Sequence, residues 1–192
     1  MYKRTRPRPE EVIVMRRVAG VFAALIFLVL LSSAAAFAQS AAELARIAEE
    51  KAARTSDADL SWDEIYAKLD QACGMLQKRG LEEGLDQLQG NSTYVFKGTY
   101  VWVHDLDYVM LMHPMKPELV GEDIKNNRDS KGKLLFQVMN ERVTVSPGNV
   151  AFVDYYWPKP GVDEGSFPKR SVVQLCDVQG KKVVLGCGKY LE

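Results

Sequence analysis

The sequence predicts an α+β fold in which an antiparallel sheet carries helices on one side. Three observations lead to this prediction. Apolar residues recur at helical spacing after Ser61, the period changes to two from Thr93 onward, and the later segments are joined by short connections of the hairpin type. We therefore expect two helices first, then two strands, a loop with one short helix, and three more strands.

The composition is that of a globular domain. The chain has 192 residues, of which 47% are hydrophobic and 26% are charged. Its 25 basic side chains balance 25 acidic ones, and no basic stripe with interleaved aromatic residues is present. We therefore expect one domain and no nucleic acid partner.

The first 38 residues have the pattern of a secretory signal peptide. Six basic side chains precede an apolar run over residues 18–31, and the small residues that follow end in Ala36-Phe37-Ala38. This order predicts cleavage between Ala38 and Gln39. An uncleaved anchor over residues 18–38 is the alternative, because that stretch is long enough to span a bilayer. In both cases the functional part is exported: it is periplasmic or secreted, or it faces the periplasm from an inner-membrane anchor.

Helices are predicted on both sides of Ser61. Residues 39–60 form an alanine-rich helical segment. Ser61 and Glu64 then have the spacing of a capping box, and Leu60 and Ile65 that of a hydrophobic staple. The apolar face of this next helix comprises Ile65, Leu69, Ala72, Cys73 and Leu76. Gly80 ends it, and residues 81–89 form a short helix that Gly84 interrupts.

Strands begin where the period changes to two. Residues 93–105 are predicted as strand with a bend or bulge at Gly98. Residues 100–104 and 109–113 form a hairpin that brings Trp102 near His113. Tyr100, Trp102 and His104 share one face of the first arm, and Val101 and Val103 share the other.

The second half of the chain alternates loops with regular elements. Residues 115–127 are a loop, residues 133–142 a helix, and residues 150–157 a strand that ends at a Pro-Lys-Pro turn. Residues 169–178 and 183–190 form the final hairpin.

The three cysteines do not have the spacing of a zinc or redox site. A hairpin turning at residues 179–182 places Cys176 opposite Leu185 and makes Cys187 a diagonal neighbour at roughly 7–8 Å, too far for a disulfide. We expect free or buried thiols, with Cys73 in the core, although pairing of Cys176 with Cys187 stays open.

Five short motifs follow one another in a specific order. They are residues 100–105, His113-Pro114 with its continuation to Gly121, residues 154–161, Pro168-Lys169, and residues 186–191. On these motifs the chain resembles the single Cache domain, a PAS-like extracytoplasmic sensor module, in its small single-Cache subfamily. The resemblance places the sensor domain at residues 61–192.

The resemblance implies a PAS-like antiparallel five-stranded sheet with a long N-terminal helix packed on it, enclosing a small ligand. It also implies a short-chain carboxylate as ligand, a membrane chemoreceptor, histidine kinase or transporter as partner, and a homodimer formed through the N-terminal helix. Two departures matter. Tyr108 stands where the family commonly has glycine, so either a left-handed turn there is strained or the turn differs. The sequence ends at Glu192, where a receptor enters its second membrane span, so we expect no signalling module of its own.

Six residues are candidates for contacting the ligand: Tyr100, Trp102, His113, Tyr155, Trp157 and Lys169. An anion in a pocket needs a positive charge or N–H donors, together with apolar walls. Lys169 is the preferred charge, ahead of Lys159, and a bound anion would favour the charged form of His113. The structural alternatives stay open: lysines solvated at the surface, a structural histidine, and aromatic residues that only fill the core.

We expect an exported, stand-alone sensor that binds a short-chain carboxylate and signals through a partner. The alternative is a ligand-free interaction module that docks on a membrane kinase, chemoreceptor or transporter. An enzyme is not expected, because the sequence has no nucleophile elbow, metalloprotease motif or phosphate loop. Asp105 and Asp107 are explained as turn residues. No cofactor or metal is expected.

Overall fold

The computed structural model describes residues 60–162 and 164–191. The predicted signal peptide or anchor (residues 1–38) and all but the last residue of the predicted helical segment (residues 39–60) lie outside this part of the chain. Among the described residues, no helix is both long and apolar enough to cross a membrane.

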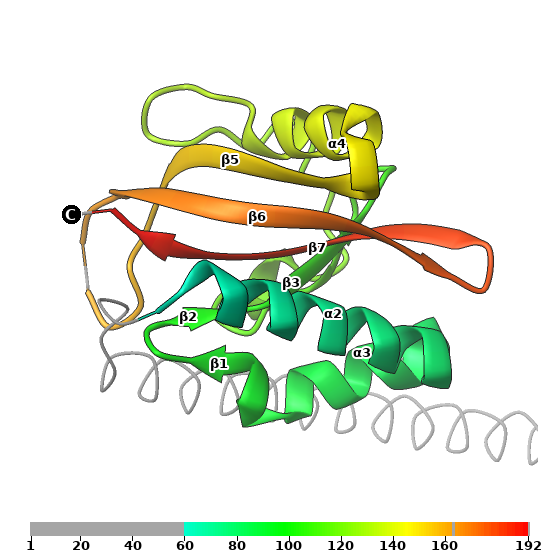
Figure 1. Ribbon diagram of the computed structural model, residues 1–192. Coiled ribbons are helices and arrows are strands. Elements are labelled where there is room, and N and C mark those ends of the chain that lie inside the picture. The colour runs from blue at the N-terminus through cyan, green and yellow to red at the C-terminus, as the bar shows by residue number, and fades with distance from the viewer. Residues whose placement is uncertain (1–59, 163, 192) are drawn as a thin grey trace, which may run out of the picture. The chain divides into compact units, whose positions relative to one another are not determined.

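A five-stranded antiparallel sheet forms the centre, with the strand order β4-β3-β7-β6-β5 (Figure 1). The strands are β3 (Trp102–Asp105), β4 (Met110–Met112), β5 (Val150–Trp157), β6 (Phe167–Val178) and β7 (Lys181–Tyr190). Three of the four pairings join strands that follow one another in sequence, and the fourth joins β3 to β7. The predicted α+β fold with a PAS-like sheet is confirmed.

Helices cover both faces of this sheet. On one face lies α2 (Trp62–Arg79), with α3 (Leu81–Gly90) beside it, and on the other lies α4 (Leu135–Val145) (Figure 1). Neighbouring residues of β3 belong to different cores: Val103 packs under α2, and Trp102 packs under α4. The predicted packing of an N-terminal helix is confirmed. The prediction that all helices lie on one side is wrong, because the aromatic face of the sheet needs α4 to cover it.

The start of α2 follows the predicted cap chemistry. The backbone N–H of Glu64 donates to the Ser61 hydroxyl at 3.1 Å, and the Glu64 carboxylate accepts from the Ser61 N–H at 3.0 Å. Leu60 and Ile65, the predicted staple, are both buried. Gly84 does not interrupt α3: a Cβ there would lie 2.8 Å from a methyl carbon of Leu76, so glycine lets the two helices approach closely.

A disulfide joins α2 to β6, which corrects the prediction of free thiols. Cys73 and Cys176 are bonded, with their Cα atoms 5.8 Å apart, while Cys187 is free and buried. The β6–β7 turn is shorter than predicted, so Cys176 pairs in register with Val183 and Cys187 with Val172. Cys176 lies on the face of the sheet that α2 covers, in the same core as Cys73 on the apolar face of that helix.

The segment before β3 also differs from its prediction. β1 (Val95–Phe96) and β2 (Thr99–Tyr100) form a separate two-stranded hairpin. Its turn consists of Lys97 and Gly98, with φ values of 44° and 71°, the pattern of a two-residue hairpin turn. The expected bend at Gly98 is therefore a complete reversal of the chain.

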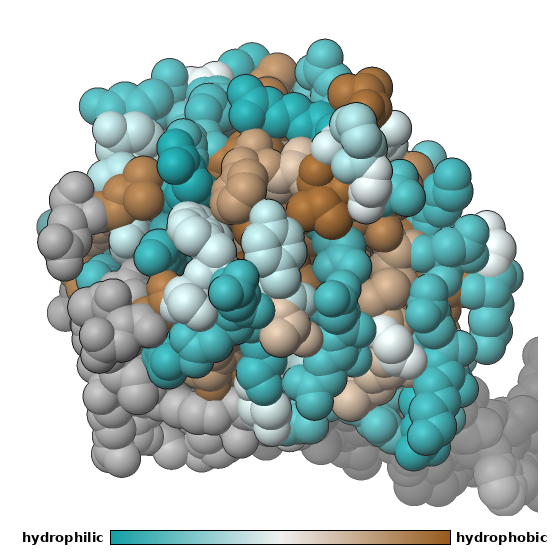
Figure 2. Space-filling view, viewed as in Figure 1, coloured by the Kyte–Doolittle hydropathy of each residue, from teal (hydrophilic) through white to brown (hydrophobic). Residues whose placement is uncertain are grey.

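Side chains protect the exposed edge of the sheet. Along β5, Arg142 donates to the Phe152 carbonyl at 2.9 Å, Lys133 donates to the Asp154 carbonyl, and Asp129 accepts from the Tyr156 N–H at 3.1 Å. These bonds occupy the backbone groups with which another strand would pair. On the side of the molecule in Figure 2, hydrophobic residues are exposed in separate areas among hydrophilic ones.

Candidate functional site

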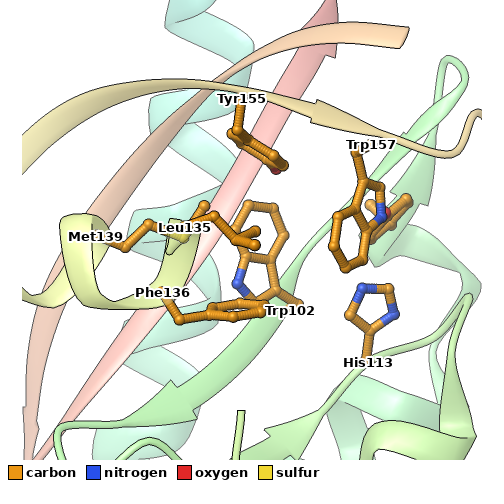
Figure 3. A pocket seen from close by; sticks show the side chains of 8 residues that line it. Trp102, His113, Leu135, Phe136, Met139, Tyr155 and Trp157 are labelled. Atoms are coloured by element: carbon orange, nitrogen blue, oxygen red, sulfur yellow. The ribbon is translucent and has the colours of Figure 1, made fainter. Parts of the chain in front are cut away.

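A small cavity lies between the sheet and α4. It contains about 190 Å³ of space that atoms do not fill, of which about 10 Å³ is wide enough for the centre of a water molecule. Its walls are the side chains of Tyr100, Trp102, His113, Leu135, Phe136, Met139, Tyr155 and Trp157 (Figure 3). None of these eight residues is acidic. We call this space the aromatic cavity.

The sheet holds the aromatic wall residues in place. Trp102 lies on β3 opposite Gly186 of β7, where a Cβ would stand 2.1 Å from the indole ring. Glycine at position 186 therefore makes the room that the indole occupies. The rings then meet edge to face or tilted, with centroid separations of 5.0 Å between Tyr100 and His113 and 6.0 Å between His113 and Trp157.

Lys169 is fully buried beside the aromatic cavity. On β6 it pairs in register with Tyr155 on one side and Tyr190 on the other. Its Nζ lies 4.2 Å from the ring centroid of Tyr100 and 5.6 Å from that of Trp102, both of them walls of the cavity. The Lys169 amino group therefore lies directly behind the aromatic wall of the cavity.

His113 is held in its neutral form. Its Nδ1 accepts the backbone N–H of Lys116 at 3.0 Å, so the proton of the neutral ring is on Nε2. Burial, and after it the charges of Lys169 and Lys116, hold the pKa of His113 well below its usual value. In the structure His113 is therefore a neutral N–H donor, unlike the charged donor expected beside an anion.

The polar groups around the cavity differ in whether they have partners. The indole N–H of Trp102 finds no acceptor among the described residues, although the side chain is buried. The Tyr155 hydroxyl is 2.9 Å from the Ser171 hydroxyl. Burial raises the pKa of the Tyr100 and Tyr155 hydroxyls well above the usual value, so both remain neutral. The cavity thus offers N–H and O–H donors within apolar walls.

His104 has a structural role. It shares a face with Trp102, but its Nε2 is 2.9 Å from Asn140 Oδ1 on α4, and Asn140 donates to the carbonyls of Asp105 and Leu106. Burial lowers the pKa of His104 to about 4, so the ring is neutral. This network ties α4 to the first hairpin and so fixes one wall of the cavity.

Five of the six predicted site residues line the aromatic cavity, and the sixth, Lys169, lies behind it. That they contact a ligand stays a prediction. Lys159 lies elsewhere, with its Nζ 5.5 Å from the ring centroid of Tyr190. Tyr108 has a left-handed conformation, with φ of 67°, so of the two alternatives the strained turn is the one present.

The α4 wall was predicted only in part. A helix was predicted over residues 133–142, but Leu135, Phe136 and Met139 were not among the predicted site residues. The apolar face of α4 was the available signal, since Phe136 lies next to Leu135 and three residues before Met139.

The five-stranded antiparallel sheet and the helices on both of its faces define a domain of the PAS-like type. More narrowly, the chain belongs to the Single Cache domain 2 family, whose family model matches residues 37–192. Domains of this family are extracytoplasmic sensor modules, which have signalling rather than catalytic roles.

The relatives agree with this assignment. The methyl-accepting chemotaxis protein McpP of Pseudomonas putida (strain KT2440) is 38% identical over 94 residues, which are 48% of this chain and 16% of McpP. The match thus spans about a sixth of that relative. A solved Cache chemosensory domain, described in terms of carboxylic acid recognition, is 30% identical with a TM-score of 0.51 over 82% of this chain and 95% of that one. A methyl-accepting chemotaxis protein from Vibrio parahaemolyticus RIMD 2210633 shares the fold, with 19% identity and a TM-score of 0.57 over 78% and 97% of the two chains.

Proposed function

We propose that this protein is an exported sensor that binds a short-chain carboxylate in the aromatic cavity and passes the bound state to a membrane receptor, kinase or transporter. One observation carries the proposal: the lining of the cavity has no acidic residue, and the buried Lys169 lies directly behind it. Carboxylate oxygens would accept from the N–H groups of Trp102 and His113, and Lys169 would supply the opposite charge. The related Cache domain described in terms of carboxylic acid recognition supports this ligand class.

Export is supported by the Cys73–Cys176 disulfide. Disulfides persist in oxidising compartments such as the periplasm and are rare in the cytosol. We propose that the signal over residues 1–38 directs the domain there, either cleaved or retained as an anchor.

Thermal shift tests the ligand. A four-atom acid such as acetate can reach about −6 kcal/mol, or tens of micromolar. At a hundredfold excess over Kd the stabilisation is about 2.7 kcal/mol, which raises Tm by about 5–10 °C. We expect such a shift for a short monocarboxylate, its loss in Lys169→Met, and its retention in Lys131→Met, which removes an equal charge outside the cavity. If no short acid shifts Tm, the proposal fails.

A ligand-free interaction module is the second candidate. The observation that favours it is the small space in the cavity, about 10 Å³ wide enough for a water centre. A module of this kind would show no Tm shift with any acid and would instead be stabilised by a membrane protein partner.

A further inference from the structure

Only about 10 Å³ of the aromatic cavity is wide enough for the centre of a water molecule, so a ligand can enter it only if part of its wall moves. A second hollow lies beside it, which we call the outer pocket. It has about 340 Å³ of space wide enough for a water centre, against about 10 Å³ in the aromatic cavity. Tyr100 and Trp157 line both spaces, so these two rings form the wall between them.

The two rings of this wall differ in how firmly they are held. Tyr100 is 1% exposed and packs between the Lys169 amino group, at 4.2 Å from its ring centroid, and the His113 ring. Trp157 is half-buried, is the last residue of β5, and is followed by the Pro158-Lys159-Pro160 turn. The Trp157 ring meets its aromatic neighbours at centroid separations of 6.0–6.3 Å, wider than the 5.0 Å between Tyr100 and His113, and its side chain is hydrogen-bonded to Tyr100. A side chain at a strand end can rotate without breaking the ladder behind it, so Trp157 is the part of the wall that can move.

Two lysines line the outer pocket. Lys116 and Lys159 lie on its lining, which contains no acidic residue among those described. The Nζ of Lys116 is 6.0 Å from the ring centroid of Trp157, and it is 3.6 Å from Glu118, an exposed carboxylate that offsets part of its charge. Positive charge around a recess raises the local concentration of anions and their rate of association.

A third hollow offers a poorer route. It shares only Tyr155 with the aromatic cavity. Its lining includes Lys131, Lys133 and the buried Lys169, but it also carries the carboxylates of Asp129 and Asp154, which the outer pocket lacks. The Tyr155 hydroxyl is bonded to Ser171 of β6, so a passage there would open the sheet between β5 and β6.

We infer that the outer pocket is an access site that collects small carboxylate anions, and that Trp157 is the gate through which they pass into the aromatic cavity. This inference rests on the proposed function. Lys116 and Lys159 set how fast the anion arrives, Trp157 sets how fast it passes, and the groups around the cavity set how tightly it is held.

Stopped-flow binding of acetate and propionate to the full chain tests the inference. In Lys116→Gln/Lys159→Gln, the association rate constant is expected to fall about fivefold or more at low salt and to lose its salt dependence, with dissociation unchanged. Lys131→Gln/Lys133→Gln, with the same change in net charge at the third hollow, keeps the wild-type rates. Equal slowing in both double variants overturns the inference, because the effect is then one of net charge.

A steric variant tests the route itself. Val162 lines the outer pocket and is 42% exposed. Val162→Trp is expected to slow association and dissociation by a similar factor and leave Kd unchanged, since it obstructs the path and not the cavity. Unchanged rates in Val162→Trp overturn the access site while acetate or propionate still binds. Absence of binding to the wild-type protein instead overturns the proposed function, and this inference with it.

Discussion

Removal of the Cys73–Cys176 disulfide is expected to be the most destabilising change outside the site. The bond joins residues 103 positions apart. Without it the unfolded chain gains the entropy that closing a loop of this length had removed, which lowers the free energy of unfolding by about 4.7 kcal/mol. For a domain of this size the loss corresponds to a fall in Tm of about 10–20 °C.

Urea unfolding of Cys73→Ala/Cys176→Ala measures this loss directly. Cys187→Ala is the matched control, because it removes a buried sulfur without opening a bond and is expected to cost about 1 kcal/mol. Thiol titration of the unfolded wild-type protein should find one free cysteine before reduction. A loss below about 1 kcal/mol in the double variant, or three free thiols, refutes the reasoning.

Three further predictions concern the supports of the cavity. The free energy of unfolding should fall as pH decreases from about 6.5 to 4. His104 has a pKa of about 4 in the folded protein, whereas the same side chain in the unfolded chain binds its proton near pH 6.5, so acid favours the unfolded state. The loss reaches about 3 kcal/mol, and a urea-unfolding free energy that stays constant over this range contradicts the prediction. Gly186→Ala should lower the free energy of unfolding by about 1–3 kcal/mol and change the near-UV dichroism of Trp102, because the new Cβ overlaps the indole. Gly74→Ala is the control: no atom lies within 4 Å of its new Cβ, so it should raise the free energy of unfolding by about 0.5–1 kcal/mol. Asn140→Ala should cost about 2–4 kcal/mol in urea unfolding, because it leaves the His104 N–H and the Leu106 carbonyl without their partner, although the Asp105 carbonyl keeps the Tyr108 N–H. A loss below about 1 kcal/mol would show that water replaces the amide.

Local chemistry explains which elements could be predicted from the sequence. The start of α2 depends on Ser61 and Glu64 and on the apolar neighbours Leu60 and Ile65, all within one turn, so it was predicted residue by residue. The alternation of β3 likewise placed Trp102 correctly on the cavity side. These features need no knowledge of how the elements pack.

The errors arose where packing between distant elements decides the outcome. Cys176 meets Cys73 only because α2 lies on the face of the sheet to which Cys176 points, and neither sequence segment contains that information. The turn at Lys97 and Gly98 was missed because the period of two continues through both arms of the hairpin. Phe136 could be assigned to the cavity only once α4 was known to cover the aromatic face.

The small size of the cavity sets a limit on the signal. A ligand shifts a conformational equilibrium only by the difference between its affinities for the two states. If acetate can contribute about 6 kcal/mol at most, any free energy used to move the walls apart is lost from affinity, at a tenfold increase in Kd for each 1.4 kcal/mol.

The walls of the cavity belong to elements that can move separately. Leu135, Phe136 and Met139 belong to α4, and Trp157 belongs to the end of β5. α4 covers one face of the sheet and the disulfide fixes α2 to the other, so expansion of the cavity would displace α4 and the end of the edge strand β5 relative to α2. The measured Kd for acetate therefore reports how much work that displacement takes, and a value of tens of micromolar would mean that most of the binding free energy remains after the walls have moved.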